Sequence, residues 1–589
     1  MKRSRRLVVL AFVLVTLALA ALEARVFYLQ VLEGDELARR LSPYHLRELG
    51  LPAPRGQILD RHGELIAVSV PAWDVEVYRP AVSKPKLLAA RLSECLPVSQ
   101  EEVAPCAPDG NQPRVKILAK GLQDDAIIWR LQQMKEKRLL PGVTLRKRFL
   151  RRYPQRELGG MLVGFVNYAG EGVSGLEAAY DGLLAGESGS RSLRHDAKDI
   201  EIADERCEEI APRPGGDIVL TIDMRLQHLA AEALRVLRET YRADRAVAIV
   251  THPRSGELLA LVQFPSVDPE DLESSRPRDW RNIAVEDYDA PGSIFKAFSM
   301  AMALEKGVVR LAESIDCENG SYRIPGRVIR DVQALGRVPL EDVIVHSSNV
   351  GMTKVFLRLV PEGTPKGSEL FRYPYQTLLN LGFGRKTALG LPHESPGKLT
   401  DLEEWSRNYT LASVAFGYEV GTSALQLAQA FGVFPNEGIL VPLRLVREIR
   451  LPGEKPRAIE TAPPGRVFSR ETAATVTRML RRVVEEGTGE SCRIPGVAVA
   501  AKSGSSVPPG REDQPCTKTA LFVAFAPVEE PQLLVLVVAQ KDATTGKFRG
   551  GTVAAPAVRM ILEGGLAVLN VSKTERCDDL PAGGRHAGF

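Results

Sequence analysis

The chain has 589 residues, enough for about two to four domains with full-sized hydrophobic cores. Its 77 basic and 73 acidic residues leave a formal net charge of +4, which excludes the strongly basic surface of a dedicated nucleic-acid-binding protein. A content of 44% hydrophobic, 25% charged and 6% aromatic residues excludes a disordered chain, a collagen and a membrane protein with many spans. The composition otherwise fits any globular enzyme or binding protein.

The amino terminus is the one segment with a membrane signature. Residues 2–6 include four basic side chains, and residues 7–22 form an uncharged, mostly apolar run. Because a bilayer core takes roughly 20 apolar helical residues, we predict a transmembrane anchor at 7–29 whose two charged side chains extend toward the interface. The basic cluster predicts a cytoplasmic tail at 1–6. The chain after the anchor would then lie on the extracytoplasmic side of the cytoplasmic (inner) membrane. The alternative is a signal peptide cleaved after the A-x-A-like site at 18–20.

The predicted elements that follow, in chain order, fall into two regions that meet near residue 215. The first region, 30–215, has predicted strands at 57–60 and 65–70, helical segments within 84–140, a strand-like run that ends at 152 and a glycine-rich stretch from 159 to 175. The second, 216–570, has a predicted strand at 217–222, a helix at 224–241, a hairpin within 246–262 and closing strands at 497–503, 521–526 and 533–539. Strands at both ends of the second region predict one sheet with helices between them. The polar segment 571–589 is typical of a flexible tail.

The cysteines and histidines show no metal-binding pattern. Seven scattered cysteines contain no CxxC pair, so at least one thiol is unpaired in an oxidising compartment. Cys95 with Cys106, or Cys492 with Cys516, could form local disulfides, and isolated buried thiols are the alternative. The eight histidines include no HExxH or clustered ligand set. We therefore expect neither a metal nor a cofactor.

Ser293 and Lys296 form the first candidate catalytic pair. They are three residues apart and follow Pro291-Gly292, a pair that would end a loop and start a helix at the serine. On a helix the two side chains share a face, and a lysine kept neutral by desolvation and nearby cations can remove the serine proton. Two other S-x-x-K matches, at 83–86 and 395–398, contain a proline that works against a helix. An isolated match is more simply a capping serine beside a solvated lysine.

A second motif, Ser347-Ser348-Asn349, places a hydroxyl and an amide on alternate residues of a predicted interhelical loop. From such a loop the Ser347 hydroxyl could relay a proton and the Asn349 amide could hold a peptide carbonyl. An ordinary loop or helix cap is the simpler interpretation, and 406–408 is another S-x-N match.

A third motif, Lys502-Ser503-Gly504-Ser505, is the only K-[S/T]-G in the sequence and ends an apolar predicted strand. The Lys502 ammonium and the Ser503 hydroxyl could bind a carboxylate. Gly504 would let a substrate backbone lie close to the strand. The Ser505 N–H could complete an oxyanion hole with the N–H of Ser293. A strand end entering a turn is the alternative.

The order Ser-x-x-Lys, Ser-x-Asn, Lys-Ser-Gly decides between these interpretations, because serine β-lactamases and penicillin-binding proteins share this ordered set. The chain resembles the class B penicillin-binding proteins, most closely the division-specific FtsI type, over nearly its whole length. Besides the three motifs, the matching segments are Arg55-Gly56-Gln57-Ile58-Leu59-Asp60-Arg61, Arg152-Tyr153-Pro154, Leu220-Thr221-Ile222-Asp223, Phe416-Gly417-Tyr418, Gly550-Gly551 and Ala555-Pro556.

The resemblance implies a multidomain α+β fold. Its parts would be the transmembrane helix at 7–29, an elongated α+β pedestal of the dimerisation type at 30–215, and a penicillin-binding transpeptidase domain at 216–570. That last domain would combine an antiparallel sheet flanked by helices with an all-helical lobe. The implied activity is a peptidoglycan D,D-transpeptidase that cross-links stem peptides at the division septum and is a target of β-lactams. A SEDS-family glycosyltransferase of the FtsW type and other division proteins are the implied partners.

The resemblance also assigns roles by position. Ser293 would attack the D-Ala-D-Ala carbonyl of a donor stem peptide, with Lys296 as general base. Ser347 and Lys502 would assist departure of the terminal D-alanine, and an acceptor amine would then resolve the acyl-enzyme. Asn349 would hold the donor amide while the donor lies antiparallel to the strand of Lys502.

Several alternatives stay open at the level of sequence. The elongation-specific class B enzyme usually carries Ser-x-Asp in place of Ser347-Ser348-Asn349, and a sporulation-specific paralogue fits the same motifs. A membrane-anchored β-lactamase is disfavoured because no glutamate is assignable as a deacylating base. A non-catalytic β-lactam sensor or division scaffold would keep the same fold. The family usually has threonine at 503 and often at 505, and serine keeps the hydroxyl at both positions.

Overall fold

The computed structural model describes residues 2–34, 36, 46–104, 113–195, 201–202, 209–387, 389–507, 516–544 and 547–571. Their contacts form two compact units built from interleaved segments. Unit 1 comprises Met1–Pro54, Pro71–Phe149 and Gly186–Pro214, and unit 2 comprises Arg55–Val70, Leu150–Ala185 and Gly215–Phe589. The sequence-based division at 215/216 uses consecutive stretches instead and stays a prediction. The expected tail lies outside the described residues after Val571.

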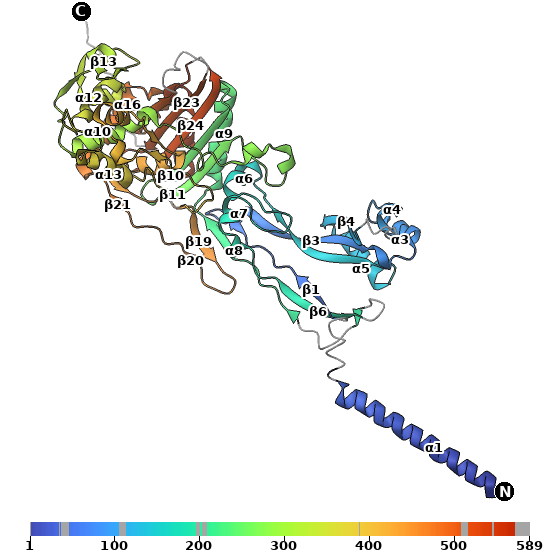
Figure 1. Cartoon of the computed structure of the whole chain (residues 1–589). Helices are drawn as coiled ribbons and strands as arrows, with labels where there is room; N and C mark the ends of the chain where they lie inside the picture. Colours follow the sequence, from blue (N-terminus) through green and yellow to red (C-terminus); the bar gives the residue numbers. More distant parts are fainter. Residues whose placement is uncertain are drawn as a thin grey trace, which may run out of the picture. The chain divides into compact units, whose positions relative to one another are not determined.

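The amino-terminal segment forms one continuous helical rod (Figure 1). It consists of α1 (Lys2–Phe27) and the π-helical turn η1 (Tyr28–Leu32). Within the helical span from Leu7 to Leu32, an 18-residue stretch has a mean hydropathy of 2.6 and none of that stretch is buried, so the span is long and apolar enough to cross a membrane. The apolar helix extends three residues beyond the predicted end at 29, because no helix breaker precedes Gly34.

The remainder of unit 1 is a small α+β assembly with its own core. Its elements are β1 (Leu46–Leu51), α3 (Pro85–Leu92), α4 (Gln100–Val103), β4 (Val115–Leu122), α5 (Asp125–Glu136), β6 (Gly189–His195), β7 (Glu201–Ile202) and β8 (Glu209–Ile210), with parts of β3 (Leu65–Tyr78) and β5 (Val143–Arg152). β1 and β6 pair antiparallel. Val75, Val77, Leu92 and Leu131 are fully buried in the core. The short helices α4 and α5 begin at side-chain caps from Ser99 and Asp124.

Unit 2 is organised around a five-stranded antiparallel sheet with the order β11-β10-β24-β23-β22 (Figure 1). Its strands are β10 (Arg245–His252), β11 (Glu257–Phe264), β22 (Ala500–Ser506), β23 (Cys516–Ala526) and β24 (Leu533–Thr544). The prediction that early and late strands of this region share one sheet is therefore confirmed. The expected strand at 497–503 begins three residues later, because Gly496 has a φ of +74° and an Ile494–Val497 bridge closes a turn there.

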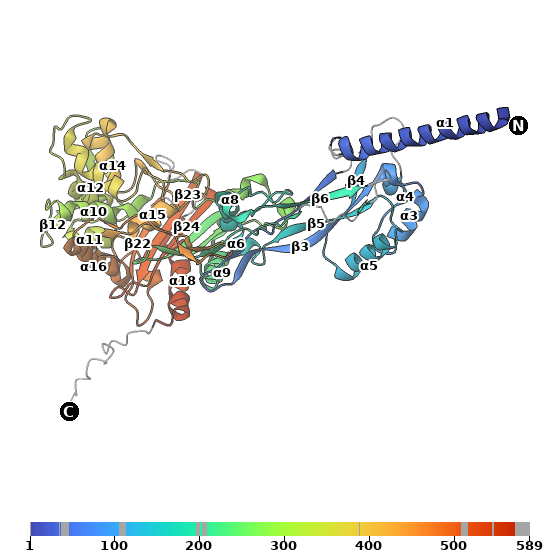
Figure 2. The same cartoon turned by 90° about the horizontal axis from the view of Figure 1, so that it is seen from below.

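Helices cover both faces of this sheet. On one face α9 (Met224–Tyr241) and α18 (Ala555–Val568) pack against alternate strand residues (Figure 2). On the other face lie the central helix α10 (Lys296–Glu305) and its surroundings, where Phe298 contacts the rings of Phe295, Phe383, Phe431 and Phe434. Two separate apolar cores thus hold the sheet, and β22 lies at its edge.

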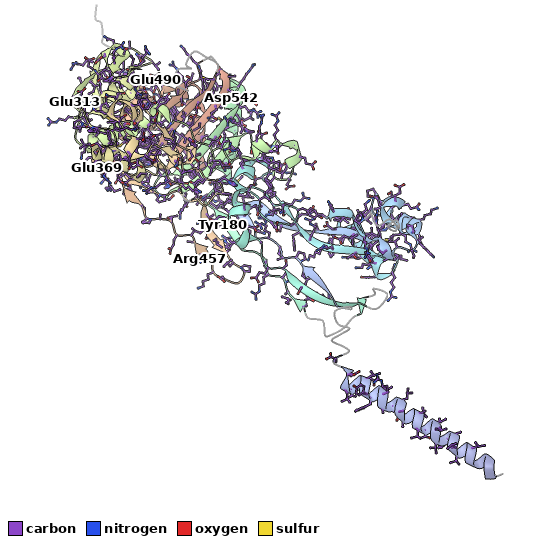
Figure 3. The ribbon with its side chains drawn as sticks, viewed as in Figure 1. Tyr180, Glu313, Glu369, Arg457, Glu490 and Asp542 are labelled. Carbon is purple, nitrogen blue, oxygen red and sulfur yellow. The ribbon has the colours of Figure 1, made fainter. Side chains whose placement is uncertain are left out.

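The part of unit 2 between β11 and β22 is mostly helical. Its main helices are α11 (Leu340–Val345), α12 (Asn349–Leu357), α13 (Arg372–Asn380), α14 (Ala412–Val414), α15 (Ala424–Phe431) and α16 (Arg470–Glu486). The hairpin formed by β13 (Ser321–Ile324) and β14 (Arg327–Arg330) and the pair of β12 (Ser314–Asp316) and β15 (Arg337–Pro339) also lie here, so this lobe is not purely helical. Glu313 and Glu369 lie at its periphery (Figure 3), where they pair with Arg358 and Arg372.

Unit 2 also contains a buried ion cluster around Glu177. The carboxylate of Glu177, which is fully buried in α7 (Gly175–Ala179), lies 2.5 Å from Arg55 Nε and 2.6 Å from Arg151 Nε. Arg55 also pairs with Asp181 at 2.6 Å. Nearby, β2 (Ile58–Leu59) runs parallel to β9 (Asp217–Leu220), and β19 (Val446–Arg450) pairs with β9 from its other side.

The remaining short elements of unit 2 connect these parts. They are α6 (Glu157–Val163), α8 (Asp181–Leu184), β16 (Lys398–Leu399), β17 (Val420–Gly421), β18 (Ile439–Leu440), β20 (Arg457–Ala458), β21 (Gly465–Arg466) and α17 (Gly550–Val553).

Candidate active site

Ser293 lies in the 3-10 turn η5 (Gly292–Phe295), which continues directly into α10. The preceding Gly292 has a φ of +54°, and a Cβ at this position would lie 2.6 Å from the backbone oxygen of Ser505. Only glycine therefore allows this turn to pack so closely against β22. Ser293 is half-buried, and its hydroxyl makes no hydrogen bond within the described part of the chain.

Lys296, the first residue of α10, is fully buried below this turn. Its Nζ donates to the backbone oxygen of Ser347 at 2.5 Å and to the Ser347 hydroxyl at 3.2 Å. Ser293 and Lys296 therefore lie together at the start of one helix, as their spacing predicts. Lys296 is also hydrogen-bonded to Ser347 of the second motif.

Ser347 lies in the tight connection between α11 and α12 with a φ of +58°. This left-handed conformation is unusual for a serine. Its hydroxyl lies between the amino groups of two lysines, 3.2 Å from Lys296 Nζ and 3.0 Å from Lys502 Nζ. One hydroxyl therefore links the lysines of the first and third motifs.

Asn349 is the first residue of α12, and its side chain is held by the hairpin of the lobe. Its Nδ2 donates to the backbone oxygen of Arg330 at 2.8 Å. The carboxylate of Asp331 accepts hydrogen bonds from the backbone N–H groups of Asn349 and Val350 and, at 2.6 Å, from the Ser348 hydroxyl. An anion at a helix amino terminus is favourable, so Asp331 fixes the loop that carries Ser347.

Lys502 lies on the edge strand β22 and is fully buried. Besides the bond to Ser347, its Nζ donates to the backbone oxygen of Ser503 at 3.2 Å. The Ser503 hydroxyl is 2.7 Å from the hydroxyl of Thr488, and the Ser505 hydroxyl accepts from the N–H of Gly550 at 3.3 Å.

Gly504 has a close neighbour that the sequence does not show. A Cβ on Gly504 would lie 3.0 Å from Ile294 and 3.1 Å from the backbone oxygen of Pro291. The missing side chain thus accommodates the turn that carries Ser293, while the role of Gly504 toward a substrate stays a prediction. The η5 turn and β22 are also close at Gly292, where a Cβ would lie 3.5 Å from the backbone nitrogen of Ser505.

The electrostatics of the site favour a neutral lysine. Burial lowers the pKa of Lys296 well below its ordinary value, and the positive charge of Lys502 lowers it further, whereas Asp331 raises it. Burial lowers the pKa of Lys502 to about 7. Because two ammonium groups in a desolvated site repel each other, the arrangement favours one charged and one neutral lysine around the Ser347 hydroxyl.

Sequence reasoning missed three parts of this site. Asp331 lies sixteen residues before Ser347, a spacing that no local pattern connects. Thr488 and Gly550 reach β22 only through tertiary packing, although Gly550 belongs to one of the segments that carried the resemblance. Among the described residues no group of three His, Cys, Asp or Glu side chains is placed to hold a metal ion.

Two family models match the chain. The penicillin binding protein transpeptidase domain matches residues 246–563, which include all three motifs. The penicillin-binding protein dimerisation domain matches residues 50–220. The chain belongs to the class B penicillin-binding proteins. Its transpeptidase domain is therefore that of a serine acyl-transfer enzyme.

Curated relatives of this class B penicillin-binding protein cover nearly its whole length. It is 33% identical to the probable peptidoglycan D,D-transpeptidase PbpC of Pseudomonas aeruginosa, over 98% of this chain and 97% of the relative. It is 30% identical to the peptidoglycan D,D-transpeptidase FtsI of Escherichia coli, over 95% and 91%, and to the stage V sporulation protein D of Bacillus subtilis, over 97% and 86%. The predicted family is thus confirmed, whereas the FtsI type is one of several among the relatives.

Solved structures show the same fold. A peptidoglycan synthetase from Bifidobacterium adolescentis matches with a TM-score of 0.71 at 22% identity, over 91% of this chain and 98% of that one. Penicillin-binding protein 3 of Mycobacterium tuberculosis in complex with ampicillin matches with a TM-score of 0.67 at 24% identity, over 90% and 98%. The predicted multidomain α+β architecture is confirmed.

Proposed function

We propose that this class B penicillin-binding protein is the peptidoglycan D,D-transpeptidase of the division septum. The observation that carries the chemistry is the meeting of two buried lysines on one hydroxyl, beside a serine with an unbonded Oγ. The septal role rests on the FtsI relative and on asparagine, rather than aspartate, at the third position of the Ser347 motif.

The acylation step follows from these positions. Ser293 Oγ attacks the carbonyl carbon of the penultimate D-alanine, and neutral Lys296 takes the hydroxyl proton. The N–H groups of Ser293 and Ser505 stabilise the oxyanion. The C–N bond then breaks, and the departing D-alanine amine receives a proton through the Ser347 hydroxyl, which is resupplied by protonated Lys502. The acyl-enzyme persists until an acceptor amine attacks it.

Substrate contacts come from the edge strand and the α12 amino terminus. The donor peptide adds to β22, the edge strand of the described sheet, in an antiparallel arrangement, with its terminal carboxylate at Lys502 and Ser503. Asn349 holds the donor amide. A β-lactam that mimics the donor's end acylates Ser293 in the same way.

The proposed cellular setting follows from the amino-terminal helix. The helix anchors the chain in the cytoplasmic membrane with 1–6 inside, and the domains at 30–215 and 216–570 work outside. A SEDS-family glycosyltransferase of the FtsW type is the proposed partner. Depletion of the protein should produce filaments, whereas round cells would indicate the elongation role and a defect confined to spores would indicate the sporulation role.

Labelling with a fluorescent penicillin tests the chemical assignment. The full-length protein in detergent should form a long-lived adduct that Ser293→Ala abolishes, while Ser395→Ala, in the proline-containing S-x-x-K match, should label normally. Persistent labelling of Ser293→Ala would refute the site. Rapid release of hydrolysed penicillin would indicate a β-lactamase, and complementation of growth by Ser293→Ala would indicate a non-catalytic sensor or scaffold.

A further inference from the structure

The guanidinium of Arg327 is a buried cation with unused hydrogen-bond donors. Arg327 begins β14, and its Nη1 donates to the Ser413 hydroxyl at 2.8 Å. Its Nε and Nη2 are buried without a hydrogen-bond partner among the described residues. A guanidinium carries five N–H groups, and leaving them desolvated and unpaired is unfavourable. Burial accordingly lowers the pKa of Arg327, although the nearby Tyr409 and Glu419 oppose this shift.

Two aromatic rings lie close to this guanidinium. Its central carbon lies 5.5 Å from the ring centre of Tyr409 and 6.0 Å from that of Phe416. Of these two residues Tyr409 is the exposed one, at 58%. Tyr409 also lies in the π-helical turn η9 (Arg407–Leu411), and such turns are frequent at functional sites.

Arg327 is connected through neighbouring residues to two backbone segments of the candidate site. Phe416 precedes Gly417, whose backbone oxygen accepts from the N–H of Gly292 at 3.2 Å, directly before the nucleophile. On the other side, Arg330 of the same strand β14 holds the side chain of Asn349. These contacts connect the strand of Arg327 to Asn349 and its ring neighbour Phe416 to the turn of Ser293, whereas none of the hydrogen bonds of Arg327 involves Lys502 or Ser503.

We propose that Arg327 is a substrate-binding residue that pairs with a second carboxylate of the donor peptide, located on the amino-terminal side of the scissile bond. This inference rests on the proposed function, because it assumes that a peptide acylates Ser293. The planar guanidinium fork matches a carboxylate with two parallel N–H bonds. The cation–π contacts are enough to explain how the guanidinium packs. They do not provide hydrogen-bond acceptors for its two unpaired N–H donors, Nε and Nη2. Entry of the carboxylate is from the exposed Tyr409 side.

A matched pair of penicillins separates substrate binding from packing. Carbenicillin is benzylpenicillin with one extra carboxylate on the acyl side chain, which occupies the place of the upstream donor residue. The second-order rate constants for acylation of Ser293 in the full-length protein are measured with both compounds, and the carbenicillin-to-benzylpenicillin ratio is compared among variants. Arg327→Met should lower this ratio roughly tenfold, which corresponds to about 1.4 kcal/mol. Arg323→Met, on the adjacent strand and exposed, should leave it unchanged.

An unchanged ratio in Arg327→Met would overturn the proposal, since a packing role affects both penicillins equally. If this variant loses reactivity toward benzylpenicillin as well, the ratio is taken from Arg327→Lys, which keeps the charge and lacks the fork. That ratio should fall about threefold, and no change there would equally refute carboxylate binding. Failure of the wild-type protein to react with either compound would refute the proposed function itself, which is a distinguishable result.

Discussion

Replacing Ser347 with glycine or with alanine separates the backbone cost of this residue from the role of its hydroxyl. Ser347 adopts a φ of +58° in the connection before α12, and its hydroxyl links Lys296 to Lys502. Both substitutions remove the hydroxyl and the same hydrogen bonds. Only glycine adopts the left-handed conformation without steric cost. The difference between the two variants therefore reports the backbone strain at this position, less the cost of the greater freedom of glycine in the unfolded chain.

The expected difference can be worked out from the backbone. An L-residue in the left-handed region costs about 1–2 kcal/mol. Glycine recovers this but loses up to about 1 kcal/mol through the greater freedom of the unfolded chain. Ser347→Gly should therefore exceed Ser347→Ala in free energy of unfolding by about 0.5–1 kcal/mol. In a unit of this size that difference corresponds to a Tm higher by roughly 1–2 °C.

Activity should fall equally in the two variants. Without the hydroxyl, the hydrogen-bonded connection between Lys502 and Lys296 is lost and the proposed route for a proton to the leaving amine with it, so acylation by a penicillin should slow by about 10²–10⁴-fold. Denaturant unfolding of the purified protein gives the stability difference, and stopped-flow acylation gives the rates. An alanine variant as stable as the glycine variant would refute the strain argument. Near-wild-type acylation in either variant would refute the proton relay.

Two further predictions concern charge. Because the pKa of Lys502 lies near 7 and the relay needs its proton, acylation should decline above about pH 7 while the low-pH decline reflects protonation of Lys296. Lys502→Arg, which stays charged but does not release its proton, should slow acylation across the whole pH–rate series, and near-wild-type rates with an unchanged profile would exclude Lys502 as the acid. Glu177→Gln should lower the free energy of unfolding by about 3–5 kcal/mol, because Arg55 and Arg151 would keep buried charges without their shared partner. Unfolding in urea measures this, and a loss under 1 kcal/mol would show that water reaches the cluster.

The parts of the site that depend on short spacing along the chain could be predicted from the sequence. Ser293 and Lys296 share one helical start because three residues make nearly one helical turn, and Pro291-Gly292 marks where that start begins. The amino-terminal helix was predictable for a similar reason, since an uncharged run behind basic residues is a local signal.

The parts that could not be predicted from the sequence depend on contacts between distant segments. The close approach of the η5 turn to Gly504 is seen only in the packing of η5 on β22. Asp331 acts on α12 from a separate hairpin, and Arg327 meets Phe416 across a large sequence separation. The start of β22 was misplaced because apolar alternation continues through the turn at Gly496, and a positive φ leaves no trace in hydropathy.

The basicity of Lys296 is itself a tertiary property. Its pKa is low because the residue is buried and because Lys502, 206 residues later in the chain, contributes a positive charge across the Ser347 hydroxyl. In the unfolded chain both lysines have ordinary pKa values and stay protonated at neutral pH, so Ser293 has no base there. In the proposed mechanism, formation of the sheet edge at β22 and docking of η5 against Gly504 are therefore both needed to bring the proposed nucleophile, its base and the oxyanion donors together. A penicillin adduct on Ser293 thus reports that β22, the α12 amino terminus and the η5 turn have assembled.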